Sequence, residues 1–98
     1  MSSLQDILSG NKPVVVDFFA DWCEPCKMMT PILNELKEKF DDQITIVKID
    51  IEKNKEFAAK HMIQSVPTLI IFKDGVEQWR RLGVSKLIEL ENHIENLI

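Results

Sequence analysis

Cys23 and Cys26 are the residues whose type and spacing point most directly to chemistry, and they are the only cysteines of the 98-residue chain. Positions three apart on a helix are neighbours, so two such thiols can lie within the Cα separation that a disulfide requires. A disulfide that closes so short a loop removes little entropy from the unfolded chain and adds little stability. The spacing therefore predicts reversible dithiol–disulfide chemistry and argues against a structural crosslink.

A zinc site is the alternative interpretation, since Cys-x-x-Cys also forms half of many zinc sites. Zinc needs four ligands, and besides the two thiols only His61 and His93 are available, neither at the spacing of a zinc motif. The sequence therefore favours a catalytic dithiol over a metal site. We expect both histidines to be solvated surface residues.

The dithiol lies where a predicted strand ends and a predicted helix begins. Residues 14–19 form a run that is apolar on both faces and predicts a central strand of a parallel sheet. Apolar residues recur at helical spacing from Cys23 to Phe40, and Pro25 falls in the first turn, where its missing N–H costs little. Backbone N–H groups and the dipole at a helix N-terminus both stabilise a thiolate.

Thiolate stabilisation alone accounts for only a small part of the expected reactivity. Lowering the pKa of a thiol from about 8.5 to about 7 raises the thiolate fraction at neutral pH about 16-fold. The lower basicity reduces nucleophilicity about fivefold, which leaves a gain of about threefold. A second cysteine that resolves the mixed disulfide therefore matters more than acidity.

The other elements follow from periodicity and turn residues. In chain order we expect helices near residues 3–10, 23–40, 54–61 and 85–97 and strands near residues 14–19, 44–49, 68–72 and 76–82. The early strand–helix alternation predicts parallel crossovers, and Asp74-Gly75 predicts a hairpin that adds an antiparallel pair. Because no repeat or linker is found, we expect one α/β domain over residues 1–98, a four-stranded mixed sheet covered by helices.

Several positions carry local expectations. Asn54 and Ser85 are expected to cap the helices that follow them, since short polar side chains accept hydrogen bonds from free backbone N–H groups. Pro31 lies inside the long helix and should kink it. The strand near residues 44–49 is expected to be buried.

Charge and hydropathy argue against several classes of function. The net charge is −4 with no stripe of Lys and Arg, which argues against nucleic-acid binding. No apolar run approaches membrane-spanning length, and residues 1–6 lack the pattern of a secretion signal. The expected location is the cytoplasm, where a Cys-x-x-Cys pair is catalytic or metal-binding more often than structural.

The dithiol motif is one of several segments that together resemble the thioredoxin family over nearly the whole chain. The matching segments are Val-Asp-Phe at 16–18, Trp-Cys-x-Pro-Cys-Lys at 22–27, Pro31, Lys-Ile-Asp at 48–50, Val-Pro-Thr at 66–68, Phe-Lys-Asp-Gly at 72–75 and Gly83. The resemblance implies a protein-disulfide reductase with a thioredoxin-like three-layer sandwich of four strands and four helices. Too few residues precede Val14 for the extra N-terminal strand of longer family members, so we expect that strand to be absent.

The resemblance also implies roles for the residues of the motif. Cys23 would be the attacking thiol and Cys26 the buried resolving thiol, and the bond between Val66 and Pro67 would be cis and face the dithiol. Taken alone, Pro67 could simply open a strand, and Trp22 could be an ordinary packing residue. The candidate target-docking residues are Trp22, Val66, Pro67, Gly83 and Val84.

Asp17 is a carboxylate in an otherwise apolar strand, where an unpaired buried charge is strongly unfavourable. It can form a structural ion pair with Lys48, which is flanked by apolar residues in the neighbouring strand. The family resemblance implies a second role, in which a desolvated Asp17 of raised pKa takes the proton from Cys26. The two roles are compatible, and the candidate catalytic residues are Cys23, Cys26, Asp17 and Lys48.

The resemblance further implies partners. The chain would reduce disulfides in target proteins as a monomer, bind no cofactor or metal itself, and receive electrons from an NADPH-dependent flavoprotein, thioredoxin reductase. Net oxidation or isomerisation, set by potential and partner, is a second enzymatic possibility. Two further alternatives are a binding or scaffold module with an incidental dithiol, and a metal or cluster bridged between two chains.

Two residues depart from the family pattern. Glu24 stands where the family usually has glycine, and its carboxylate should disfavour the thiolate of Cys23 and make the protein a slightly stronger reductant. Glu24 and Pro25 are therefore the candidate residues that tune the redox chemistry. Met62 stands where a helix-ending glycine is expected, and a left-handed Met costs about 1–2 kcal/mol, so we expect the loop to Val66 to run differently.

Overall fold

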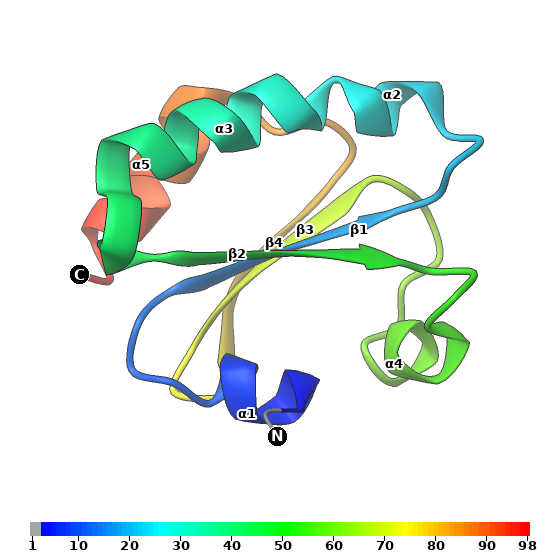
Figure 1. The fold of residues 1–98 in the computed structure, drawn as a ribbon, viewed down its shortest axis with the longest axis horizontal. Helices are drawn as coiled ribbons and strands as arrows, with labels where there is room; N and C mark the ends of the chain where they lie inside the picture. The colour runs from blue at the N-terminus through cyan, green and yellow to red at the C-terminus, as the bar shows by residue number, and fades with distance from the viewer. Residues whose placement is uncertain (1–2) are drawn as a thin grey trace.

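The computed structural model of the protein describes residues 3–98 and shows a three-layer α/β sandwich (Figure 1). Within these residues, a four-stranded mixed sheet has the strand order β2-β1-β3-β4. The elements are α1 (Leu4–Leu8), β1 (Val14–Phe19), α2 (Glu24–Lys27), α3 (Met29–Phe40), the 3-10 helix η1 (Asp41–Gln43), β2 (Thr45–Asp50), α4 (Lys55–Lys60), β3 (Thr68–Lys73), β4 (Val76–Leu82) and α5 (Leu87–Glu95). The predicted four-stranded fold is confirmed. No helix in the described part is long and apolar enough to cross a membrane.

The strand β1 is central because alternate residues bury against the two helical layers. Val15 packs in the core that includes residues of α3 and α5, whereas Val16 and Phe18 pack in the core that includes residues of α1 and α4. Figure 1 shows α2, α3 and α5 on one face of the sheet and α1 and α4 on the other. Since strand side chains alternate in direction, Asp17 shares the α3 and α5 face with Val15.

The direction of β3 corrects one prediction about topology. The strands β1 and β2 are parallel, as predicted for a helical crossover, but β1 and β3 are antiparallel. The segment from β2 to β3, which contains α4, begins and finishes at the same end of the sheet. The chain therefore makes no crossover there, and β3 runs antiparallel to β1 and β2. The expectation of a buried second strand is also wrong in part, because β2 is an edge strand whose residues 45–48 are half-buried or exposed.

The predicted long helix is divided into α2 and α3 by Met28. The cause is Pro31, four residues after Lys27, because proline has no backbone N–H to donate to the Lys27 carbonyl. The disruption that we expected from Pro31 therefore takes the form of an interruption at Met28, within the turn before it. It gives the first turn, which carries the dithiol, its own short helix.

Asn54 holds the N-cap position of α4, but its side chain makes no capping hydrogen bond. Its Nδ2 instead donates to the carbonyl oxygen of Asp50 at 3.1 Å. The Asp50 side chain accepts the backbone N–H groups of Glu52 and Lys53. The predicted cap is therefore wrong, because the Asn54 side chain is turned back toward the end of β2.

Ser85 does not cap the last helix, which begins at Leu87 with Lys86 in the N-cap position. The Ser85 side chain is buried, and its hydroxyl has no hydrogen-bond partner in the part of the chain that the structure describes. The prediction is wrong because the side chain enters the interior instead of meeting the free N–H groups of the first turn.

Met62 adopts the left-handed conformation, with φ 56°, that glycine would normally provide. Its N–H donates to the Ala59 carbonyl at 3.0 Å, and the N–H of Ile63 donates to the Ala58 carbonyl at 3.0 Å. These two bonds form the Schellman closure usual for glycine. The expectation that the loop would run differently is therefore wrong, and the strain at Met62 is offset by these hydrogen bonds.

His61 is not the solvated residue that we expected. Its ring lies 4.6 Å from that of Phe57 and 5.3 Å from that of Phe72, between centroids, and its Nε2 is buried. Burial lowers the pKa of His61, and the nearby positive charges of Lys60 and Arg80 lower it further. His93 stacks on Trp79 with centroids 4.5 Å apart, so both histidines take part in aromatic packing.

Candidate redox-active site

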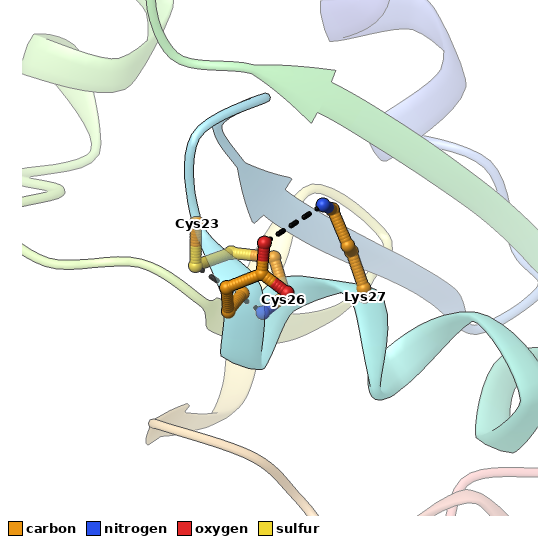
Figure 2. Close-up of polar contacts among 4 residues, drawn as sticks. Cys23, Cys26 and Lys27 are labelled. Carbon is orange, nitrogen blue, oxygen red and sulfur yellow. Dashed lines mark hydrogen bonds and ion pairs between the residues drawn. A yellow bond between two sulfur atoms is a disulfide. The ribbon is translucent and has the colours of Figure 1, made fainter.

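Cys23 and Cys26 form a disulfide at the start of α2, with their Cα atoms 5.4 Å apart (Figure 2). Cys23 occupies the N-cap position, and its Sγ accepts the backbone N–H of Cys26 at 3.2 Å. A free N–H at a helix N-terminus is the group that stabilises a thiolate in the reduced form. The local sequence thus places a sulfur atom at the favourable end of the helix.

The two cysteines are equally buried in this disulfide form, with 4% of each residue exposed. The exposed fraction therefore does not distinguish an attacking from a resolving sulfur. The hydrogen bond does distinguish them, because among residues 3–98 only the Sγ of Cys23, and not that of Cys26, accepts a backbone N–H. No cluster of three His, Cys, Asp or Glu side chains suited to a metal occurs in residues 3–98.

Asp17 is fully buried in β1, on the face that α3 covers. Neither carboxylate oxygen has a hydrogen-bond partner among the described residues. Burial raises the pKa of Asp17 from 3.8 to about 6, and the positive charge of Lys48 partly opposes this rise. The carboxyl group can therefore gain and lose a proton near neutral pH.

Lys48 lies directly opposite Asp17 in the β1–β2 register, but no ion pair joins them in residues 3–98. The Lys48 ammonium instead donates to Thr30 Oγ1 at 3.2 Å and lies 5.2 Å from the centroid of the Phe19 ring. The predicted ion pair is wrong because β2 is an edge strand, where a long side chain keeps its charged end in water.

Thr30 is a site residue that sequence reasoning missed. It lies one helical turn after Cys26, and that spacing is the signal that could have identified it. A pocket of about 140 Å³ brings Thr30, Lys48 and Cys26 together at the end of β1. Its lining residues are Phe19, Ala20, Asp21, Cys26, Lys27, Thr30 and Lys48.

The peptide bond between Val66 and Pro67 is cis, at the entrance to β3. Val66 packs against the cluster that contains Cys23 and Cys26. The Pro67 carbonyl accepts the N–H of Gly83 at 2.8 Å, so Gly83 is tied to the residue that follows Val66. Gly83 has φ 90°, a conformation that disfavours any residue with a Cβ.

Trp22 and Val84 differ in exposure. Trp22 precedes the dithiol directly and is 66% exposed, so its ring is available to another molecule. Val84 is partly buried and packs against the core that includes residues of α3 and α5. Two further apolar side chains are exposed close to these residues in the sequence, Met28 shortly after Cys26 and Met62 shortly before Val66.

Glu24 forms an ion pair with Lys27, with Oε1 and Nζ 2.9 Å apart, which Figure 2 draws as the dashed line that ends at Lys27. Both side chains are largely exposed, at 82% for Glu24 and 65% for Lys27. The neighbouring ammonium and solvent both reduce the field of the carboxylate at Cys23. Pro25 lies in the first turn of α2, as expected.

The thioredoxin family model matches residues 2–96. The chain belongs to the thioredoxin family. It is 44% identical over 96 residues to a thioredoxin of Mycobacterium bovis, a match that covers 94% of this chain and 83% of that protein. It is 47% identical over 97 residues to chloroplastic thioredoxin Y2 of Arabidopsis thaliana. That match covers 97% of this chain but only 58% of the relative.

The fold agrees with that of solved thioredoxins. A mutant thioredoxin from Halobacterium salinarum NRC-1 superposes with a TM-score of 0.87 and 34% sequence identity, covering 99% of this chain and 84% of that chain. A thioredoxin domain with an active-site cysteine pair at disulfide distance is a thiol–disulfide oxidoreductase. Protein-disulfide reduction is therefore the activity class of this chain.

Proposed function

We propose that Cys23 attacks a disulfide of a target protein and that Cys26 completes the reduction. The Cys23 thiolate displaces one target sulfur as a thiolate and forms a mixed disulfide. The Cys26 thiolate then attacks Cys23 Sγ, which releases the second target sulfur and leaves the Cys23–Cys26 disulfide. The single observation that carries this assignment is the hydrogen bond from the Cys26 N–H to Cys23 Sγ, because it favours charge on Cys23.

Asp17 is the group that accepts the proton of Cys26 in the second step. Its burial and its pKa of about 6 support this role, since a base with a pKa near the working pH is the most effective. Lys48 lies opposite it in register and lowers the pKa by its charge, so Lys48 adjusts the base without touching the sulfur. Thr30 accepts a hydrogen bond from the Lys48 ammonium and so limits where that charge can lie.

Targets dock as an extended segment across Trp22, Val66, Pro67 and Gly83. Pro67 has no backbone N–H because its nitrogen is part of the ring, and the backbone of Val66 can pair with an extended target beside the sulfurs. The exposed ring of Trp22 supplies apolar contact area next to Cys23. Val84 supports this surface from beneath, because it is partly buried in the core.

A separate reductase returns electrons to the disulfide. A protein of Mycobacterium leprae whose name is bifunctional thioredoxin reductase/thioredoxin is 38% identical to this chain over 97 residues, which is 21% of its length. The joining of the two activities in one relative supports a reductase as the partner of this chain. We infer an NADPH-dependent flavoprotein as the electron donor, no cofactor on this chain itself, and a monomer that works in the cytoplasm.

Trapping of the mixed disulfide tests the two cysteine roles. The Cys26→Ser variant should accumulate a covalent complex with a disulfide-bonded target through Cys23, because the resolving thiol is missing. The Cys23→Ser variant, a matched control with one thiol of the same pair, should trap little and reduce nothing. Non-reducing electrophoresis and mass spectrometry identify the bond, and equal trapping by both variants would overturn the assignment.

A further inference from the structure

The strand β2 has an open edge. On its other side it pairs with β1, where the N–H of Thr45 donates to the Pro13 carbonyl and the N–H of Ile51 donates to the Phe19 carbonyl, each at 3.0 Å. Alternate residues of a strand direct their backbone groups to opposite sides. Ile46 and Lys48 therefore direct their N–H and C=O groups away from β1, to a side where no strand of residues 3–98 pairs.

A groove of about 390 Å³ runs between this edge and α3. Its floor is apolar and includes Leu33, Ile44 and Ile46. Because Ile46 contributes both a free backbone edge and part of this floor, a strand placed beside β2 would direct alternate side chains into the groove. The groove thus offers backbone pairing and apolar contact together.

The charge of this groove is opposite to that of the whole chain. Three lysines, Lys12, Lys37 and Lys48, line it with one carboxylate, Asp42, whereas the net charge of the protein is −4. The Lys37 ammonium is fixed there by hydrogen bonds to the carbonyls of Asp41 and Ile44, at 2.6 and 2.8 Å. An acidic occupant therefore matches this surface.

The other edge strand, β4, is unsuited to the same use. Its pairing with β3 contains a register shift between Ile71 and Phe72, and such irregularities twist an edge away from further pairing. Its arginines are also engaged, Arg80 with Glu77 and Arg81 with Glu89. The β1–β2 register shows no such shift.

We propose that the open edge of β2 and its groove bind an extended, acidic segment of a partner protein, which adds a strand beside β2. The backbone of Ile46 and Lys48 sets the register, the apolar floor takes alternate side chains, and the lysines attract carboxylates. A second copy of this chain fits less well, because it would bring its own Lys48 to the same edge. This inference does not rest on the dithiol chemistry.

The test uses the oxidised protein and two peptides with blocked ends, one alternating valine with glutamate and one alternating valine with lysine. Nuclear magnetic resonance of the backbone amides follows each titration. The acidic peptide should shift the amides of Ile46 and Lys48 and leave those of β4 unchanged. The basic peptide should bind at least about fivefold more weakly, because its charge matches that of the groove.

Two variants and one control locate the contact. Ile46→Pro removes one outward N–H and part of the apolar floor but none of the N–H groups that pair with β1, and it should weaken binding of the acidic peptide roughly tenfold. Lys12→Glu reverses one charge of the groove and should weaken binding of the acidic peptide about threefold. Lys55→Glu makes the same change on α4, on the opposite face, and should have no effect. Circular dichroism checks that each variant is folded.

Three results would overturn the proposal. The first is equal binding of the two peptides, and the second is a set of amide shifts centred on Trp22 and Val66 instead of β2. The third is a concentration-dependent dimer, seen by sedimentation, that shifts the same β2 amides without peptide. The Lys12→Glu result decides the question even if Ile46→Pro does not fold.

Discussion

The two ends of the sheet are built differently. At the hairpin end, the N–H groups of Asp74 and Gly75 donate to the carbonyls of Gly10 and Leu8, and the Lys73 ammonium donates to the carbonyl of Leu97. At the dithiol end, the buried carboxylate of Asp17 has no hydrogen-bond partner among residues 3–98. The apolar side chains of Trp22 and Met62 are exposed there.

This difference shows that the fold gains stability at the hairpin end and loses stability at the dithiol end. The hairpin end follows the local rules, since Asp74 and Gly75 both have the positive φ that a two-residue hairpin requires. The dithiol end violates those rules with a buried charge and exposed apolar side chains. Such violations are expected at functional sites.

The largest expected effect is the loss of the base at the dithiol end. Asp17→Asn removes the proton acceptor for Cys26 and should slow the resolution of the mixed disulfide about 100-fold. The wild-type rate should also fall as the pH drops below about 6, because Asp17 becomes protonated there, whereas the rate of the variant should not follow this titration. Stopped-flow release of the target thiol measures both.

Asp21→Asn is the matched control, since Asp21 lines the small pocket beside Cys26 but is exposed. Its rate of resolution should stay near that of the wild type. Equal rates for wild type and Asp17→Asn over the whole pH range would remove Asp17 from the mechanism.

A smaller effect is expected at the hairpin end, and there it should fall on stability alone. Gly75→Ala forces a side chain into φ 78° and should lower the free energy of unfolding by about 1–2 kcal/mol. Disulfide reduction should be unchanged. Urea unfolding and a reduction assay measure the two properties.

Gly10→Ala serves as the control at the same end, because its backbone is not in the positive-φ region and the added Cβ would lie 3.4 Å from the Ile7 carbonyl oxygen. Its unfolding free energy should change by no more than about 0.5 kcal/mol. A loss of reductase activity in Gly75→Ala would show that the two ends are not independent.

The smallest effect concerns Glu24. Glu24→Gln should raise the rate of Cys23 alkylation in the reduced protein by about twofold at most, because the carboxylate is exposed and paired with Lys27. High salt should abolish the difference, and Lys27→Met should shift the rate in the opposite direction. A tenfold change that persists in high salt would show a direct contact that the ion pair conceals.

Local signals were sufficient for most of the fold. The apolar run at 14–19 and the Asp74-Gly75 turn depend on neighbouring residues, and the structure confirms the strand and the hairpin that they predicted. The helical spacing after Cys23 also predicted helix correctly, although the structure divides that helix at Met28. The dithiol was likewise located from its spacing and from the strand–helix boundary. These features are encoded within a few residues.

Features that depend on distant residues could not be predicted in the same way. The direction of β3 depends on where the segment after β2 returns to the sheet, and no local pattern records this. The contact of Lys48 with Thr30 depends on β2 being an edge strand. The packing of His61 on Phe72 joins α4 to β3, which only the tertiary structure reveals.

The most direct test of the contrast between the two ends is the free energy of unfolding of wild type and Asp17→Asn as a function of pH. Because folding raises the pKa of Asp17 from 3.8 to about 6, the folded protein keeps a proton that the unfolded chain has lost. The contribution of Asp17 to stability therefore declines as the pH rises through this interval.

Relative to wild type, Asp17→Asn should gain about 2–3 kcal/mol in unfolding free energy between about pH 4 and about pH 8. A constant difference over this range, or a variant that becomes relatively less stable at high pH, would contradict the claim that the dithiol end holds a charge at the expense of stability.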